Sequence, residues 1–259
     1  MNRFVTELDN LSQDLMKMGA LVEQQLDSAS QALAENKLAL AREVIKRDND
    51  VDEVENAIIE QTIKLLATFQ PVAADLRFLS TTQRMAMDLE RVADLSVNLC
   101  WRVVAMNEEV ELKAPISPLL PQMAIVAASM MSQAMDAFAA RDEAMAVGVL
   151  HRDDELDDLN RQHRAVMIEL MQKRPELVPW GVEAINASSH LERIGDHVTN
   201  LAEEVVYLVK GLVLRHGALP VNATGITDAD TPEECVTSAR DMADAAHASP
   251  PARPAGTVK

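Results

Sequence analysis

The stretch LERVAD at residues 89–94 recurs as LERIGD at residues 191–196, at an offset of 102 residues. Both copies run on to an Asn-Leu pair, at Asn98 and Asn200. A repeated segment of this kind indicates that the chain is built from two copies of one structural unit. Within each copy, the glutamate and the aspartate are four residues apart, a spacing that places them on one face of a helix.

A second acidic pair precedes each copy. Asp48 and Asp52 follow Arg47 in the first half, and Asp153 and Asp157 follow Arg152 in the second. These acids also share a helix face by their spacing. Like charges at this spacing destabilise a helix by about 0.2–0.5 kcal/mol. The four pairs therefore carry a cost that a purely structural role does not explain.

Apolar residues follow helical periods along most of the chain, which predicts an all-α fold. One stripe runs from Phe4 to Leu33, a second from Val44 to Leu65 and a third from Phe78 to Val103. In the second half, we expect helices over about 122–140, 142–172 and 184–212. Short connections between long helices favour antiparallel neighbours. The sequence thus predicts two tandem three-helix bundles, made of six long antiparallel helices.

Prolines and composition indicate the boundaries between the repeats. The periodicity lapses between residues 107 and 121, where Pro115, Pro118 and Pro121 lie. We therefore expect a first repeat over 1–108, a linker over 109–121 and a second repeat over 122–216. Residues 217–259 hold five of the eleven prolines and no apolar period. Such a segment buries too little surface to offset its ordering entropy, so we expect a disordered tail.

The composition excludes several classes of function. A formal net charge of −17 argues against a nucleic-acid-binding protein and against strong direct attraction to an anionic membrane. Cys100 and Cys235 form no zinc or disulfide pattern, which indicates a reducing compartment. We expect neither a signal peptide nor a membrane-spanning segment. These points predict a cytoplasmic protein with only indirect membrane association.

The acids adjoin the apolar stripes, because Asp52, Glu90, Asp157 and Glu192 each follow a buried-type residue. Acids from neighbouring helices are therefore expected to converge at the rim of a groove. Carboxylates without imidazole or thiolate favour hard cations, namely iron, manganese, magnesium or calcium before zinc or copper. The predicted ligands, four in each half, are Asp48, Asp52, Glu90, Asp94, Asp153, Asp157, Glu192 and Asp196.

Each polar residue near these predicted ligands has two possible roles. Arg91 and Arg193 pair with adjacent acids or hold an anion, and a surface ion pair is the commoner role of such an arginine. Asn98 and Asn200 are either hydrogen-bond donors to the acids one turn earlier or ordinary polar helix positions. His197 follows Asp196, but its counterpart in the first copy is Leu95, so a structural role is favoured over a ligand role.

With LERVAD and LERIGD in its two halves, and with QPVAADLR at residues 70–77, the chain resembles the PhoU family of phosphate-transport accessory proteins. The resemblance covers about residues 3–215. It implies two three-helix bundles, clusters of iron, or else of manganese or magnesium, at the eight acids, and a cytoplasmic homodimer. It also implies negative regulation of phosphate uptake and of the phosphate-starvation two-component response. The implied partners are the ATPase subunit of the phosphate ABC transporter and the phosphate-sensing histidine kinase.

Two other functions remain open from the sequence. A carboxylate-bridged metal oxidase, or a metal-storage bundle, also uses paired acids on helices. Di-iron oxidases use Glu-x-x-His motifs, however, and the residues three after Glu90 and Glu192 are Ala93 and Gly195. A helical scaffold with solvated acids is the third possibility, and it predicts no bound metal. No nucleophile–base pair or Gly-rich phosphate loop is present, which predicts a protein that is not an enzyme.

Overall fold

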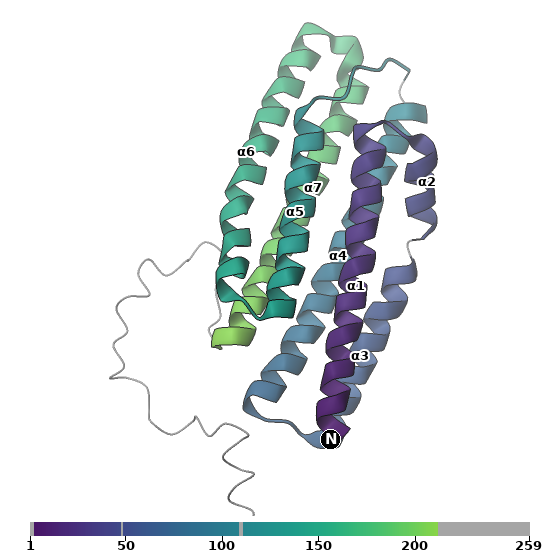
Figure 1. The fold of residues 1–259 in the computed structure, drawn as a ribbon. Coiled ribbons are helices and arrows are strands. Elements are labelled where there is room, and N and C mark those ends of the chain that lie inside the picture. Colours follow the sequence, from purple (N-terminus) through teal and green to yellow (C-terminus); the bar gives the residue numbers. More distant parts are fainter. Residues whose placement is uncertain (1–2, 48, 109–110, 212–259) are drawn as a thin grey trace, which may run out of the picture. The chain divides into compact units, whose positions relative to one another are not determined.

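The computed structural model describes residues 3–47, 49–108 and 111–211, and these residues form seven α-helices, one short 3₁₀ helix and no strand (Figure 1). The all-α prediction is confirmed. The elements are α1 (Arg3–Ala34), α2 (Leu38–Lys46), α3 (Asn49–Phe69), α4 (Ala73–Glu108), α5 (Leu119–Ala140), α6 (Glu143–Lys173), η1 (Pro175–Leu177) and α7 (Val178–Lys210).

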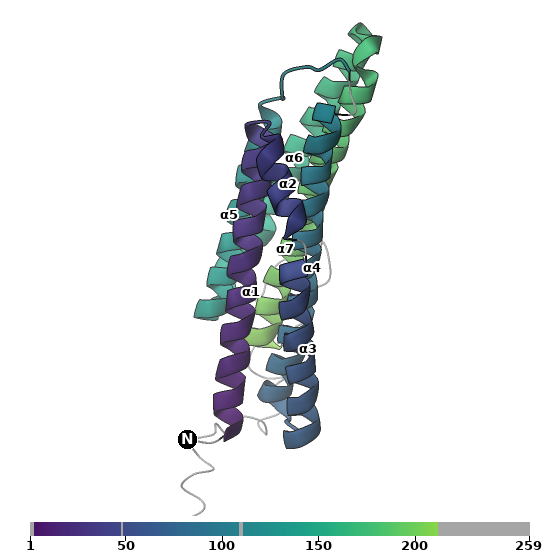
Figure 2. The ribbon, with the colours of Figure 1, turned by 90° about the vertical axis from the view of Figure 1, so that its right-hand side faces the viewer.

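The two halves join along α4 and α7, which share the most extensive contact between any two elements. In the first half, α4 packs on α1, α2 and α3, and in the second half α7 packs on α5 and α6. Helices α1 and α5 also lie in contact, on the same side of the bundle (Figures 1 and 2). The described residues therefore form one compact unit in which each half contributes one central helix.

Helices α4 and α7 run in opposite directions. Arg84 near the start of α4 pairs with Glu204 near the end of α7 at 2.7 Å, whereas Arg102 pairs with Glu183 at 2.9 Å. Between these ion pairs lie the apolar stripes predicted from the repeat. All of these stripe residues are fully buried: Leu89, Val92, Leu99, Val103, Leu191, Ile194, Leu201 and Val205.

The second predicted helix is broken in two, which the apolar stripe did not reveal. Helix α2 ends at Lys46 and α3 begins at Asn49, whereas the equivalent part of the second half is the uninterrupted α6. The local sequence explains the difference. Asn49 and Asp50 compete with the helix for backbone hydrogen bonds, whereas the second half has Asp154 and Glu155 at the equivalent positions, and Glu is a better helix former.

Helix α5 begins at Leu119, three residues before the predicted start. The sequence interpretation placed the boundary after Pro121, but proline is tolerated in the first turn of a helix, where its missing N–H has no partner in any case. The Ser117 hydroxyl accepts a hydrogen bond from the Leu119 amide at 3.4 Å at this end. The predicted tail over 217–259 and the second cysteine, Cys235, lie outside the described residues.

Helix α5 is long and apolar enough to cross a membrane by length and composition alone, contrary to the expectation from the sequence. More than half of its apolar window is buried inside the bundle, however, against α1, α6 and α7. Met123, Met130 and Met131 are among its fully buried residues. It is therefore a core helix of this fold.

The repeated leucines should contribute equally to stability. Because Leu89 and Leu191 are both fully buried, we expect Leu89→Ala and Leu191→Ala each to lower the free energy of unfolding by about 2–5 kcal/mol. Ile125→Ala, at an exposed position of α5, should change it by less than about 0.5 kcal/mol. Urea unfolding measures all three. A loss below 1 kcal/mol at either leucine would contradict the central position of α4 and α7.

Candidate metal centre

Three carboxylates of the first half converge between α3 and α4. Asp52 lies in the first turn of α3, and Glu90 and Asp94 lie one turn apart on α4. One carboxylate oxygen from each lies within 4.8 Å of the others. All three side chains are half-buried. In the part of the chain that the structure describes, no other set of three His, Cys, Asp or Glu side chains meets this criterion.

The charges of this cluster act strongly on one another. Burial, and then the charge of Asp94, raise the pKa of Glu90 to about 7, even though Arg91 opposes the shift. Glu55 and a hydrogen bond with Asp94 raise it further. A carboxylate in such surroundings ionises at neutral pH only against repulsion. A bound cation would remove this repulsion, and hard oxygen ligands suit iron, manganese or magnesium.

Glu55 belongs to the same charged group, although the sequence analysis did not identify it. Burial, followed by the charge of Asp52, raises its pKa, with Arg91 opposing and Asp94 adding to the shift. It lies three residues after Asp52 on α3, a helical spacing that would have indicated a shared face. The search for repeated acids missed it because Asn160 occupies the equivalent position in the second half.

The residues around the first cluster have varied roles. Arg91 contacts both Glu90 and Asp94 at 3.4 Å, so it acts as the surface ion-pair partner that its type favours. Asn98 is exposed and makes no hydrogen bond with the acids in the described ranges. Asp48, a predicted ligand, lies outside the described residues. Its place beside Asp52 stays a prediction.

The four acids of the second half form a looser group between α6 and α7. Burial first, and then the charges of Asp157, Asp196, Asp154 and Glu192, raise the pKa of Asp153 to about 6. Burial and the charges of Asp196 and Asp157 likewise raise the pKa of Glu192. The predicted acids therefore share one electrostatic environment. Their oxygens do not form a group of three as close as that of the first half.

Asn200 and His197 both contact Asp88, an acid that the sequence analysis did not consider as their partner. Asn200 donates a hydrogen bond to Oδ1 of Asp88 on α4 at 3.1 Å, and Nδ1 of His197 lies 2.9 Å from the same oxygen. Both side chains thus reach from α7 to the first half. Arg193 is exposed and influences Glu192 only through its charge.

The family model of the PhoU domain matches residues 15–103 and 120–205. A PhoU homolog of Pseudomonas putida is 33% identical over 88% of this chain and 91% of its own length. The Escherichia coli K12 protein, a phosphate-specific transport system accessory protein PhoU, is 30% identical over 83% of this chain and 88% of its own.

Solved structures agree with the sequence relatives. The crystal structure of PhoU from Pseudomonas aeruginosa superposes with a TM-score of 0.78 at 31% identity, covering 81% of this chain and all of the other. The phosphate transport system regulatory protein PhoU of Streptococcus pneumoniae superposes with a TM-score of 0.76 at 28% identity, covering 82% of this chain. The fold is thus that of the phosphate-transport accessory proteins. The chain belongs to the PhoU family.

Gly195 lies between Glu192 and Asp196 on α7, and α6 packs closely against it. A Cβ atom at Gly195 would overlap Cδ2 of Leu156 and lie 3.1 Å from Oδ1 of Asp153. We expect Gly195→Ala to lower the free energy of unfolding by about 1–3 kcal/mol through this overpacking. The loss should occur although alanine is the better helix former. Thermal unfolding measures the effect, and an unchanged or raised midpoint would show that α6 and α7 are not so close.

The raised pKa of Glu90 makes stability depend on pH. Because this pKa is higher in the folded chain than in the unfolded chain, the cost of ionising Glu90 is absent below about pH 4.5, grows towards pH 7 and is complete above it. In the presence of EDTA, we expect Glu90→Gln to stabilise the protein at pH 8 by about 1 kcal/mol, after allowance for solvent screening.

The same substitution should have little effect at pH 4.5, where Glu90 is protonated in the folded chain and only about half ionised in the unfolded chain. Thermal midpoints of the two proteins across this pH range test the expectation. A gain of equal size at both pH values would mean that charge repulsion is not the cause.

Proposed function

We propose that this protein is a cation-binding regulator of phosphate transport. The observation that carries the proposal is the convergence of Asp52, Glu90 and Asp94 in a chain of the PhoU family. The relatives are named as accessory proteins of the phosphate-specific transport system, and a structural neighbour as a regulatory protein of that system. This chain therefore regulates phosphate transport by binding partner proteins and not by catalysing a reaction.

The cation would act through the geometry of neighbouring helices. Asp52 is on α3 and Glu90 and Asp94 are on α4, so an ion shared by them ties the two helices together. Without the ion, the same carboxylates repel one another and loosen this contact. Carboxylate ligands favour hard cations, and among these the family resemblance implies iron, with manganese or magnesium as alternatives. The second half offers a related acidic group, with Asp153 at its centre.

The direction of the regulation follows from the family resemblance. When phosphate is plentiful, the protein restrains uptake and silences the phosphate-starvation two-component response. Its partners are the ATPase subunit of the phosphate ABC transporter and the phosphate-sensing histidine kinase. It works in the cytoplasm as a homodimer, and it reaches the membrane only through these partners. The large helical faces of the bundle suit docking to such proteins.

A deletion strain tests the proposal. In phosphate-rich medium, loss of the gene should derepress phosphate-starvation genes and raise phosphate accumulation, and the wild-type gene should restore silencing. The variant that combines Glu90→Gln with Asp94→Asn should change silencing, because its first acidic cluster keeps only Asp52 of the three convergent carboxylates. Reporter expression and cellular phosphate content are the measurements.

A matched variant controls for the loss of two negative charges. Asp9 and Glu60 are exposed and lie outside the cluster, Glu60 being eight residues beyond Asp52 on α3, so Asp9→Asn with Glu60→Gln should behave like wild type. Metal analysis of each purified protein, after loading with iron, manganese or magnesium, should show fewer ions only in the cluster variant. Normal silencing in the deletion strain would refute the regulatory role, and equal metal content in all three proteins would refute the cation site.

A further inference from the structure

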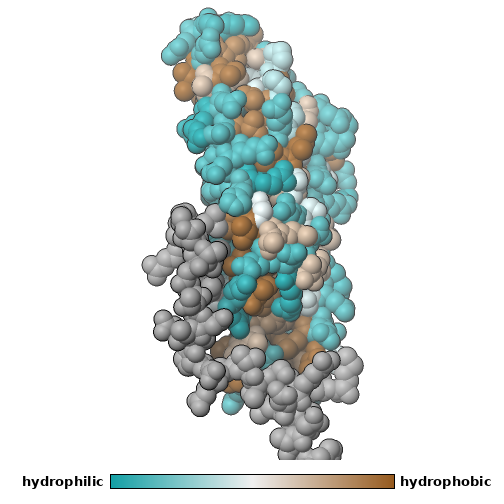
Figure 3. Space-filling view, turned by 60° about the vertical axis from the view of Figure 1, so that its left-hand side comes forward, coloured by the Kyte–Doolittle hydropathy of each residue, from teal (hydrophilic) through white to brown (hydrophobic). Residues whose placement is uncertain are grey.

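Two polar side chains of α6 are buried, although this helix has a hydrophilic outer face. Asn160 is 7% exposed and His163 is fully buried, whereas hydrophilic residues cover much of the outer surface on the side of α6 (Figure 3). Within the described residues, Oδ1 of Asn160 and both ring nitrogens of His163 have no hydrogen-bond partner. A buried polar atom without a partner costs about 1–3 kcal/mol. Proteins rarely keep such an atom unless an ion, a water or a functional role accounts for it.

Asn160 shares a helix face with two of the predicted metal ligands. Asp153, Asp157 and Asn160 follow one another at intervals of four and three residues, which is the spacing of a single face of a helix. This face turns towards α7, because Leu156 and Asp153 both approach Gly195. Asn160 therefore points into the seam between α6 and α7, at one end of the second acidic group.

The charges around Glu192 place Asn160 level with this residue. Burial and the charge of Asp196 raise the pKa of Glu192 most, but Asp157 and Arg164 of α6 also act on it, in opposite directions. Glu192 thus faces the part of α6 between Asp157 and Arg164. Asn160 lies in that part of the helix. Its unpartnered oxygen is consequently next to the acids and not in a remote part of the core.

The first half has a carboxylate at the position of Asn160. At the offset of 105 residues that relates the earlier acidic pairs of the two halves, Glu55 corresponds to Asn160. Burial, and then the charge of Asp52, raise the pKa of Glu55, and the charge of Asp94 adds to the shift. This position therefore lies beside the acids in the half where they converge. The five equivalent positions carry five acids in the first half, but four acids and one amide in the second.

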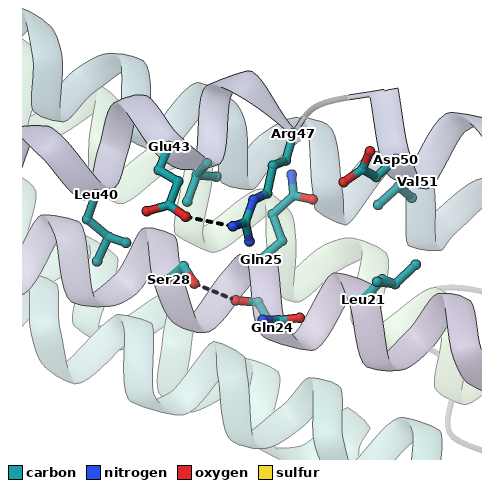
Figure 4. A pocket seen from close by; sticks show the side chains of 10 residues that line it. Leu21, Gln24, Gln25, Ser28, Leu40, Glu43, Arg47, Asp50 and Val51 are labelled. Carbon is teal, nitrogen blue, oxygen red and sulfur yellow. Dashed lines mark hydrogen bonds and ion pairs between the residues drawn. The ribbon is translucent and has the colours of Figure 1, made fainter.

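The surroundings of these positions also differ between the halves. In the first half, the break between α2 and α3 leaves a pocket of about 80 Å³ against α1, and Arg47, Asp50 and Val51 line part of it (Figure 4). In the second half α6 is continuous, and Leu156, the counterpart of Val51, packs against Gly195. An amide suits this closed seam, because it supplies an oxygen to a cation without adding a negative charge that must be buried.

We propose that Asn160 is a neutral oxygen ligand of a cation bound in the second acidic group, and that it makes this site the weaker of the two. The inference rests on the proposed function, in which the acids of both halves bind cations. Asparagine carbonyls are ordinary ligands of hard cations, and the affinity of such sites rises with the number of charged ligands. Four acids and an amide therefore hold an ion less tightly than five acids. The two halves fill at different cation concentrations, which gives the protein a graded response.

Titration of the full-length chain with Mn²⁺, followed by the electron paramagnetic resonance signal of the free ion, tests the proposal. Glu90→Gln with Asp94→Asn restricts binding to the second half. In this background, we expect Asn160→Leu to weaken Mn²⁺ binding at least about tenfold, and Asn160→Asp to strengthen it by a similar factor because it adds a charged ligand. The matched control is His163→Leu, which replaces the other unpartnered polar side chain of this face and should leave the affinity unchanged.

Thermal unfolding in EDTA separates a ligand from a structural residue. Asn160→Leu keeps a similar shape and removes an unpartnered buried oxygen, so the midpoint without metal should stay the same or rise. The structural alternative is a bound water that bridges Asn160 and His163. It predicts the opposite result, a lower midpoint with unchanged Mn²⁺ affinity, and that result would overturn the proposal. Asn160→Asp decides the question independently if Asn160→Leu does not fold.

The reverse background, Asp153→Asn with Glu192→Gln, measures the first half alone, where we expect Mn²⁺ to bind at least about tenfold more tightly than in the second. Equal affinities of the two halves, or equal weakening by Asn160→Leu and His163→Leu, would contradict the role of Asn160. Mn²⁺ binding in the first half but not in the second would overturn this inference and leave the proposed function standing. Absence of binding in both halves would refute the cation site itself.

Discussion

The contact between α4 and α7 is the constraint on which the rest of the structure depends. Each of these helices is the central helix of its own half, and each buries its apolar stripe completely. The stripes fix the rotation of both helices about their axes. Once that rotation is fixed, the acids that follow the buried leucines must lie at the edges of the stripe, where α3 and α6 approach. The position of the metal candidates is therefore a consequence of core packing.

The repeated segments LERVAD and LERIGD, with the apolar periods around them, were enough to predict most of this arrangement. Leucine and valine at helical spacing in both halves indicated long helices with one buried face, and the residues in question are fully buried. The convergence of Asp52 with Glu90 and Asp94 was also predictable, because acids beside facing apolar stripes must meet at the rim between two helices. Periodicity and spacing carry this information since they are local properties of a helix.

Other features cannot be predicted from an apolar stripe or from the repeat. The break between α2 and α3 lies at the weak helix formers Asn49 and Asp50, but the apolar stripe continues across it unchanged. The attachment of His197 and Asn200 to Asp88 joins residues more than a hundred positions apart. Glu55 was missed because only one half contains it. Each of these features departs from the symmetry of the repeat, and a search for repeats detects what the halves share.

The hydrogen bonds that Asp88 accepts make the two halves unable to replace each other. Exchanging α7 for a second copy of α4 would set Asp88 opposite Leu95 and Asn98, the counterparts of His197 and Asn200. One of its two donors would then be lost in a half-buried position, at a cost of about 1–3 kcal/mol. Two copies of the first half would also bring Arg84 against Arg102 in place of Glu204. The two halves of the duplication have thus become complementary. Each half packs better against the other than it would against a second copy of itself.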